Sequence, residues 1–268
     1  MTYLIIAKWC IKMLEGNYEK RIEMRETMNA FVSDIKKFLG NGKDNEEGKS
    51  LERFLMEYDP NRYQNPSVTA DILVFQKRKE IHDLENGLKL LLIQRKNHPC
   101  IGWWALPGGF VEIHEDIDKA AARELLEETG LSDIPMEQIY TFGKQDRDPR
   151  TRIVTVAYLA LLESDQKVIA GDDAAEAEWF FVKIDKVIEE IMKEDGIASK
   201  NKRKRVRYHI EVICEKNHDR KAEAIVDYFT NVDTLLLQED YKVIESNGIA
   251  FDHPAFIVRA YQLLKNRL

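Results

Sequence analysis

One stretch, residues 109–131 (GFVEIHEDIDKAAARELLEETGL), constrains the fold of this 268-residue chain more than any other. Residues 117–129 contain no glycine or proline and are rich in Ala, Leu, Glu, Lys and Arg, which favour the helical state. Gly130 stands where a glycine commonly ends a helix. Apolar side chains recur at a spacing of four residues, at Ile117, Ala121 and Leu125. The stretch therefore predicts an amphipathic helix that packs one face against a sheet.

The same helix carries three carboxylates that leave from one face. Glu124, Glu127 and Glu128 are related by steps of three and four residues, so their side chains are neighbours on the helix surface. Carboxylates crowded in this way repel one another unless a positive charge lies among them. Because hard oxygen ligands suit Mg²⁺ or Mn²⁺, the helix predicts a divalent metal site.

The spacing of the whole stretch matches the Nudix box at every defined position. Five residues separate Gly109 from Glu115, and seven more precede Arg123-Glu124-Leu125; single spacers then lead to Glu127-Glu128 and to Gly130-Leu131. The chain therefore resembles the Nudix hydrolase superfamily. This resemblance implies an α/β fold, an α/β/α sandwich that carries a mixed sheet. The alternative is an ordinary solvated amphipathic helix with many glutamates.

The resemblance also implies a role for each charged residue of the box. Glu124, Glu127 and Glu128 would be metal ligands, and the backbone carbonyl of Gly109 would add a fourth donor for Mg²⁺ or Mn²⁺. Arg123 would orient Glu127 from four residues away, and Glu115 would anchor the helix by pairing with Arg123. Such a metal relieves the charge of a diphosphate and activates the attacking water.

Segments outside the box resemble the ADP-ribose pyrophosphatase-like branch of the superfamily. They are residues 58–75, 140–150 (YTFGKQDRDPR), 175–180 (AEAEWF) and 248–264. In the second segment, Arg147 and Arg150 could fork onto phosphate oxygens or a ribose, with Asp148 between them, although salt-bridged loops have similar sequences. Phe110 or Trp103 could stack on a base, or simply pack in the core.

Proteins of this branch are of two kinds. Some hydrolyse ADP-ribose to AMP and ribose 5-phosphate, and others are transcriptional regulators of NAD or sugar metabolism with a winged helix after the closing helix. This sequence ends at Leu268, soon after the segment that fits the closing helix, and its box is intact. Both features favour a hydrolase of ADP-ribose. The alternatives are a sensor or other protein that binds ADP-ribose without turnover, and a hydrolase of NADH, a nucleotide sugar or a damaged nucleoside triphosphate.

The general base is the least determined part of this site. In the family it lies in the box or on a later loop, and here Asp172, Asp173 and Glu176 precede Trp179 on such a loop. Each of them could equally be a solvated loop acid. Glu112 is close enough to the box to assist with the metal or the water. We expect two histidines to be surface or structural residues: His98 and His114.

Charge and cysteine content limit the partners of the chain. A net charge of −7 disfavours general nucleic-acid binding, although the basic run 202–207 (KRKRVR) could touch DNA or solubilise a strand edge. Three widely spaced cysteines without a CxxC disfavour a zinc site and a disulfide framework, which is typical of the cytoplasm. Residues 3–7 are apolar but too few to span a membrane. We expect a small-molecule substrate and a homodimer.

Two regions extend beyond the usual Nudix core. Residues 1–58 predict a helical extension, with helices at 18–39 and 51–58 around a linker at 40–50, that could cover a sheet edge or form a dimer contact. Residues 59–268 would form the Nudix domain, with core strands at 68–75, 88–95, 139–142 and 153–162. An insertion at about 185–247 predicts a helix at 185–193, a strand at 206–212 and a hairpin partner at 223–230.

Overall fold

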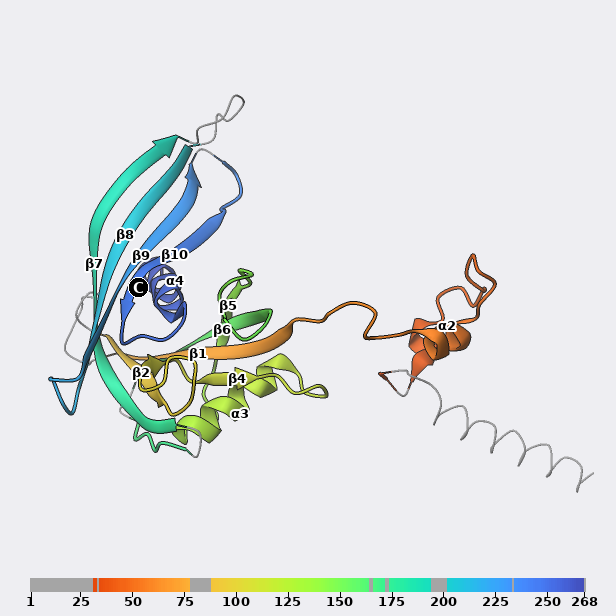
Figure 1. The fold of residues 1–268 in the computed structure, drawn as a ribbon, viewed down its shortest axis with the longest axis horizontal. Coiled ribbons are helices and arrows are strands. Elements are labelled where there is room, and N and C mark those ends of the chain that lie inside the picture. The colour runs from red at the N-terminus through yellow and green to blue at the C-terminus, as the bar shows by residue number, and fades with distance from the viewer. Residues whose placement is uncertain are drawn as a thin grey trace, which may run out of the picture. The chain divides into compact units, whose positions relative to one another are not determined.

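The structure is a computed structural model that describes residues 31–32, 34–77, 88–163, 166–171, 174–193, 202–232 and 234–267 (Figure 1). It divides into two units, Met1–Asn65 and Pro66–Leu268. Within these described residues, no helix is long and apolar enough to cross a membrane.

The described part of the first unit contains two short helices, η1 (Ile35–Phe38) and α2 (Leu51–Glu57). The predicted helix at 51–58 is confirmed as α2, which begins where the Ser50 side chain accepts a hydrogen bond from the backbone N–H of Arg53. Of the helix predicted at 18–39, residues 18–30 lie outside the described residues. Its described end is not an α-helix: Phe31 lies in a bend, and the Asp34 side chain starts a separate 3₁₀ turn, η1, by accepting from the N–H of Lys36.

The second unit is built on one ten-stranded sheet, in which the strand order is β10-β9-β8-β7-β2-β1-β6-β5, with β3 beside β2 and β4 beside β1. The strands are β1 (Ser67–Lys77), β2 (Leu88–Arg95), β3 (Trp104–Ala105), β4 (Gly108–Phe110), β5 (Glu137–Phe142), β6 (Ile153–Leu162), β7 (Ala174–Lys193), β8 (Lys202–Cys214), β9 (Lys221–Val232) and β10 (Glu239–Asn247). β1 pairs in parallel with β6 and antiparallel with β2 and β4, so the predicted mixed sheet is confirmed.

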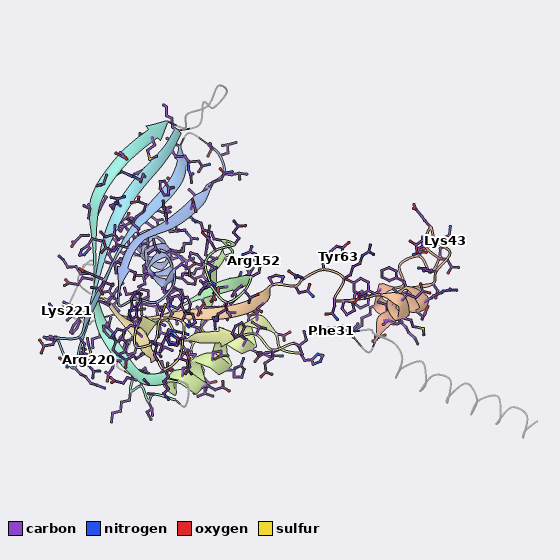
Figure 2. The ribbon with its side chains drawn as sticks, in the orientation of Figure 1. Phe31, Lys43, Tyr63, Arg152, Arg220 and Lys221 are labelled. Carbon is purple, nitrogen blue, oxygen red and sulfur yellow. The ribbon has the colours of Figure 1, made fainter. Side chains whose placement is uncertain are left out.

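Two helices cover opposite faces of the sheet, α3 (Ile117–Thr129) and α4 (His253–Lys265) (Figure 1). Successive side chains of a strand point to opposite faces. Accordingly, Ile72 and Val74 of β1 pack in a core cluster with Leu125 of α3, whereas Leu73 and Phe75 lie in the cluster that contains α4. Side chains fill the space between the sheet and both helices (Figure 2). β1 is thus buried on both faces, which explains its apolar run Ile72–Phe75.

The inserted segment extends the sheet instead of forming a helix. Residues 185–193, predicted as a helix, continue β7 far beyond its pairing with β2, and β8, β9 and β10 follow in an antiparallel array. Cross-strand ion pairs hold β7 to β8, among them Glu190 with Arg205 at 2.6 Å. The predicted strand at 206–212 and its hairpin partner at 223–230 are confirmed as parts of β8 and β9.

The basic run 202–207 lies on β8, which has β7 on one side and β9 on the other. The expectation that it forms a strand edge is therefore wrong. Its cations pair with acids of the neighbouring strands: Lys204 with Glu189, Arg205 with Glu190, and Arg207 with Asp227. These pairs across strands account for much of its charge.

The four strands of the extension curve around α4 (Figure 1). The contact between them is partly polar: Arg259 of α4 makes an ion pair of 3.0 Å with Glu239 of β10, and the Tyr228 hydroxyl donates to the same carboxylate at 2.8 Å. Arg259 also donates to the carbonyl of Ile139 on β5 at 3.2 Å. This network ties the extension, the closing helix and the core sheet together.

Residues 166–171 close the C-terminal end of α3, where Gly130 caps the helix as predicted. The N–H groups of Ile169 and Gly171 donate to the carbonyls of Thr129 and Glu128 at 3.0 and 3.2 Å, so they satisfy two acceptors that a helix end leaves open. The approach is so close that a Cβ atom on Gly171 would lie 1.6 Å from the carbonyl oxygen of Glu127.

We therefore predict that Gly171→Ala lowers the free energy of unfolding by about 1–3 kcal/mol, because the loop must move away from the helix end. Urea denaturation measures this difference. Gly143→Ala is the matched control, since its Cβ would meet no atom closer than 4.0 Å. Equal stability of the two variants would contradict the prediction.

Candidate active site

The pairing of β4 with β1 places the glycines of the box against the box helix α3. Gly109 lies opposite Ala70 in this register, and the Gly108 N–H donates to the Glu128 carboxylate at 2.8 Å. A Cβ atom on Gly109 would lie 2.4 Å from Glu124 Oε1. The absence of a side chain at this position therefore allows the box strand to lie directly against the box helix.

Arg123 is the centre of a hydrogen-bond network within the box. Its guanidinium donates to both carboxylate oxygens of Glu115, each at 2.9 Å, and to the carbonyl of Phe110 at 3.1 Å. It also donates to Glu124 at 2.8 Å and to Glu127 at 3.0 Å. These hydrogen bonds, above all those to Glu115, raise the pKa of Arg123, so the guanidinium remains charged and offsets the repulsion among the carboxylates.

The three helix carboxylates differ in their surroundings. The side chain of Glu127 is 58% exposed and that of Glu124 is 14% exposed, while Glu128 is buried. Burial raises the pKa of Glu124, although its hydrogen bond to Arg123 acts in the opposite direction. A buried carboxylate of raised pKa gains most from a cation placed beside it.

The predicted metal site is not gathered in this conformation. Among the described residues, no group of three or more His, Cys, Asp or Glu side chains is arranged to hold a metal ion. The reason is visible in the network, because Glu124 and Glu127 are turned to Arg123 and Glu128 is turned to the Gly108 N–H. The donor chemistry nevertheless fits a hard divalent cation, since three carboxylates and a backbone carbonyl lie on one helix face and the strand beside it.

A cavity of about 410 Å³, here called the box cavity, opens beside the box. Gly109, Phe110, Glu112, Glu124 and Glu128 line its box side. Polar and charged residues of β1, β2, β6 and α4 line the remainder: Thr69, Asp71, Arg95, Thr155 and His253. The box cavity is therefore a site lined by both cations and carboxylates.

The segment 146–150 reaches the box cavity, as expected. Arg147 is 5% exposed and is fixed by two hydrogen bonds to Asp252, at 2.9 and 2.7 Å, and one of 2.6 Å to the Thr155 hydroxyl. Arg150 forms a forked pair with Asp148 at 3.0 and 2.8 Å and lies 5.5 Å from the ring centre of Phe110. Arg150 is 42% exposed, so it can reach an anion in the cavity, whereas Arg147 is held in place.

Asp148 serves mainly to position Arg150. Its carboxylate is buried and accepts from both the side chain and the backbone N–H of Arg150. Burial acts to raise the pKa of Asp148, but the hydrogen bonds from Arg150 outweigh it and hold this pKa below its ordinary value. With its oxygens occupied in this way, Asp148 holds the guanidinium of Arg150 in place.

Of the acidic residues predicted as bases, the described ones differ in their distance from the box cavity. Glu176 pairs with Arg220, in the turn between β8 and β9 (Figure 2), and does not line the box cavity. Asp172 and Asp173 lie outside the described residues. Glu112 does line the cavity. His98 and His114 are exposed.

Several residues of the cavity were not predicted from the sequence. Asp71 is buried in β1, and the hydroxyls of Thr69 and Thr155 lie 2.5 Å apart beside it. Burial raises the pKa of Asp71 to about 7 and lowers that of His253 to about 3, and the Nδ1 of His253 accepts from the N–H of Leu106. A single carboxylate within an otherwise apolar strand was the available signal for Asp71.

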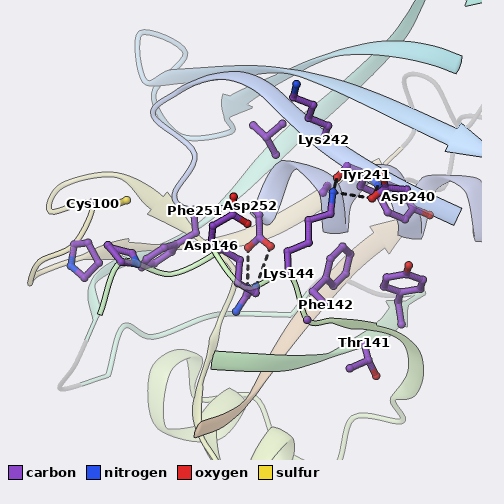
Figure 3. Close-up of a pocket in the computed structure, with 17 residues that line it drawn as sticks. Cys100, Thr141, Phe142, Lys144, Asp146, Asp240, Tyr241, Lys242, Phe251 and Asp252 are labelled. Atoms are coloured by element: carbon purple, nitrogen blue, oxygen red, sulfur yellow. Dashed lines mark hydrogen bonds and ion pairs between the residues drawn. The ribbon is translucent and has the colours of Figure 1, made fainter. Parts of the chain in front are cut away.

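A second cavity, of about 750 Å³, lies next to the first (Figure 3). It is here called the β10 cavity, because Asp240, Tyr241, Lys242 and Val243 of β10 form one wall. The opposite wall is formed by the end of β5 and by residues 143–149, and Phe251 and Asp252 close one side. Arg147 and Phe251 line both cavities.

The fold and this site define an α/β/α sandwich that presents a carboxylate-bearing box helix to a polar cavity. The NUDIX domain matches residues 66–201, about half of the chain. A MutT/nudix family protein from Enterococcus faecalis of known crystal structure has 30% sequence identity and a TM-score of 0.55, over 88% of this chain and 76% of that one. The chain therefore belongs to the NUDIX family.

Two curated relatives match shorter stretches. An ADPR responsive transcriptional repressor, NtrR, of Acinetobacter baylyi is 40% identical over 116 residues, 42% of this chain and 44% of the repressor. An ADP-ribose pyrophosphatase of Methanocaldococcus jannaschii is 40% identical over 119 residues, 44% of this chain and 63% of the enzyme. The chain thus spans less than two thirds of either relative.

The raised pKa of Asp71 predicts a pH dependence of stability. An unfolded aspartate loses its proton near pH 3.8, whereas the folded carboxyl keeps it up to about pH 7. The folded state therefore binds more protons in this window, and stability falls as the pH rises through it, by about 2–4 kcal/mol. Asp71→Asn should abolish this loss.

Urea unfolding at pH 5 and at pH 8, without added metal, tests this expectation through the difference between wild type and Asp71→Asn. The difference cancels the contribution of His253, whose lowered pKa has the opposite effect, since its stabilisation is lost as the pH falls below about 6.5. Parallel pH profiles of the two proteins would show that Asp71 is ionised in the folded state.

Proposed function

We propose that this protein hydrolyses the diphosphate bond of a nucleoside diphosphate linked to a second moiety, with ADP-ribose as its substrate. The observation that carries the proposal is the box helix, because two of its three carboxylates, Glu124 and Glu128, line a cavity that Arg150 also lines. A cavity lined by both carboxylates and arginines suits a diphosphate accompanied by a divalent cation.

In this proposal Glu124, Glu127, Glu128 and the carbonyl of Gly109 hold Mg²⁺ or Mn²⁺. The bound ion supplies neutralisation of the diphosphate charge and a water of lowered pKa. Glu127 and Glu124 would exchange a hydrogen bond from Arg123 for the cation, and Arg123 would keep its two bonds to Glu115. Arg123 and Glu115 then act by holding the box helix and the loop before it in place.

The remaining residues bind and orient the substrate. Arg150, supported by Asp148, donates to phosphate or ribose oxygens, and the exposed face of Phe110 stands beside it. Glu112 lines the box cavity, and in this proposal it accepts the proton of the attacking water. Glu176 is paired with Arg220 away from this cavity, so we assign the base to Glu112 instead.

ADP-ribose as the substrate rests on the two curated relatives, both of which are named for ADP-ribose. The enzyme among them is 40% identical over 119 residues. Other nucleotides joined through a diphosphate, such as NADH or a nucleotide sugar, share the chemistry of the box and remain part of the substrate test.

A second function, the binding of ADP-ribose without turnover, is favoured by one observation. One of the two curated relatives, NtrR, is named as an ADPR responsive transcriptional repressor and not as an enzyme. A protein of this kind would bind ADP-ribose and leave it intact.

We predict that the wild-type protein releases AMP from ADP-ribose with Mg²⁺ or Mn²⁺, and that Glu128→Gln lowers kcat at least about 100-fold by removing a carboxylate from the metal site. Product release is measured against ADP-ribose, NADH, nucleotide sugars and nucleoside triphosphates. Glu245→Gln, an exposed glutamate of β10, is the control and should retain full activity.

Two results would overturn the hydrolase. Absence of turnover for every substrate, together with tight binding of ADP-ribose, would establish the sensor instead. Turnover that persists in Glu128→Gln, or in the presence of a chelator, would show that the box does not take part in the reaction.

A further inference from the structure

We propose that the β10 cavity binds the nucleobase end of the substrate, so that the inserted strand β10 forms part of the binding site. The proposal rests on the proposed function, because it takes the diphosphate to lie in the box cavity. It assigns a role to the extension, which neither the box nor the relatives explain.

The two cavities are continuous in their lining. Arg147 and Phe251 belong to both, and Arg147 is fixed there by Asp252 and Thr155. A substrate with a diphosphate at its centre and a group at each end can therefore place one end in each cavity, passing Arg147 on the way. The volumes of about 410 and 750 Å³ are in the range of small-molecule sites.

The chemistry of the walls decides which end enters which cavity. Aromatic and aliphatic side chains contribute much of the β10 cavity, among them Tyr140, Phe142, Val243, Phe251 and Ala255. A flat heteroaromatic base is suited to such walls, since it buries apolar surface and can stack. The box cavity is lined by several arginines and carboxylates, and it suits a sugar phosphate.

The charges of the β10 cavity point to an uncharged ligand group. Three cations and three acids line it, and two pairs of them bind each other: Lys144 with Asp240 at 2.7 Å, and Arg147 with Asp252 at 2.7 Å (Figure 3). The remaining two, Asp146 and Lys242, are of opposite sign. A cavity without net charge has no preference for a phosphate, whereas it can accept a neutral base.

The position of β10 depends on contacts with the core. Lys144, in the segment after β5, donates to the carbonyl of Tyr241 at 2.5 Å and pairs with Asp240 (Figure 3). Arg259 of α4 holds Glu239 at the start of the same strand. β10 is therefore held in place by Lys144 from the segment after β5 and by Arg259 from α4. The cavity is thus formed by elements that are fixed relative to one another.

The test fills the β10 cavity without touching the box. Val243→Trp places a large side chain in the wall, and Asp146→Trp does so from the exposed segment after β5. We expect each to raise the Kd for AMP and the KM for ADP-ribose at least about tenfold, because the base can no longer enter. The affinity for ribose 5-phosphate, which lacks the base, should stay unchanged.

Ile244→Trp is the matched control, because Ile244 is the next residue of β10, is 42% exposed and does not line either cavity. It should bind AMP as the wild type does. Calorimetric titration with AMP and with ribose 5-phosphate gives the affinities, and circular dichroism shows that each variant is folded.

The outcomes separate this proposal from the hydrolase. If the wild type binds AMP but shows no turnover, and both tryptophan variants lose AMP binding, the subsite is supported and the hydrolase is overturned. Turnover of ADP-ribose with unchanged AMP affinity in the folded variants would overturn the subsite alone. A wild type that does not bind AMP, or variants that lose ribose 5-phosphate equally, would also overturn it.

Discussion

The structure of the second unit depends on the burial of β1 on both of its faces. Because its side chains alternate between two core clusters, β1 requires a helix on each side, and α3 and α4 supply them. The strand also pairs with β2, β4 and β6, which fixes the box glycines and the segment 146–150 beside the same few residues. Asp71 and Thr69 lie on β1 itself, so the scaffold of the fold is also the floor of the site.

The box helix combines stability and chemistry in one network. Arg123 joins the helix to Glu115 and to the carbonyl of Phe110, and these contacts set the distance between the box loop and the helix. The same guanidinium neutralises Glu124 and Glu127. A divalent cation that binds these carboxylates would therefore have to compete with Arg123 for them.

Much of the fold could be predicted from the sequence, because the box spacing and the apolar strands are local signals. The core strands and the box helix appeared where expected, and Arg123 contacts Glu115, Glu124 and Glu127. Residues 185–193 were mistaken for a helix, since Ile184, Ile188 and Ile191 follow a helical spacing. Pairing with β8 overrides that pattern. His253 and Phe251 were not predicted as site residues, because they are far from the box in the sequence. Only the fold brings them to the box cavity.

The length of β7 has a consequence for the mechanics of the molecule. One continuous strand belongs to the core at its start and to the extension at its end, and the chain returns from β10 almost directly into α4. No flexible tether separates the two parts, so the extension is not a domain that swings on a hinge. We therefore expect its motions to be bending and twisting of a sheet, and we expect it to unfold together with the core. Strain applied to the far end of the sheet is therefore transmitted along the strand to the residues beside the box.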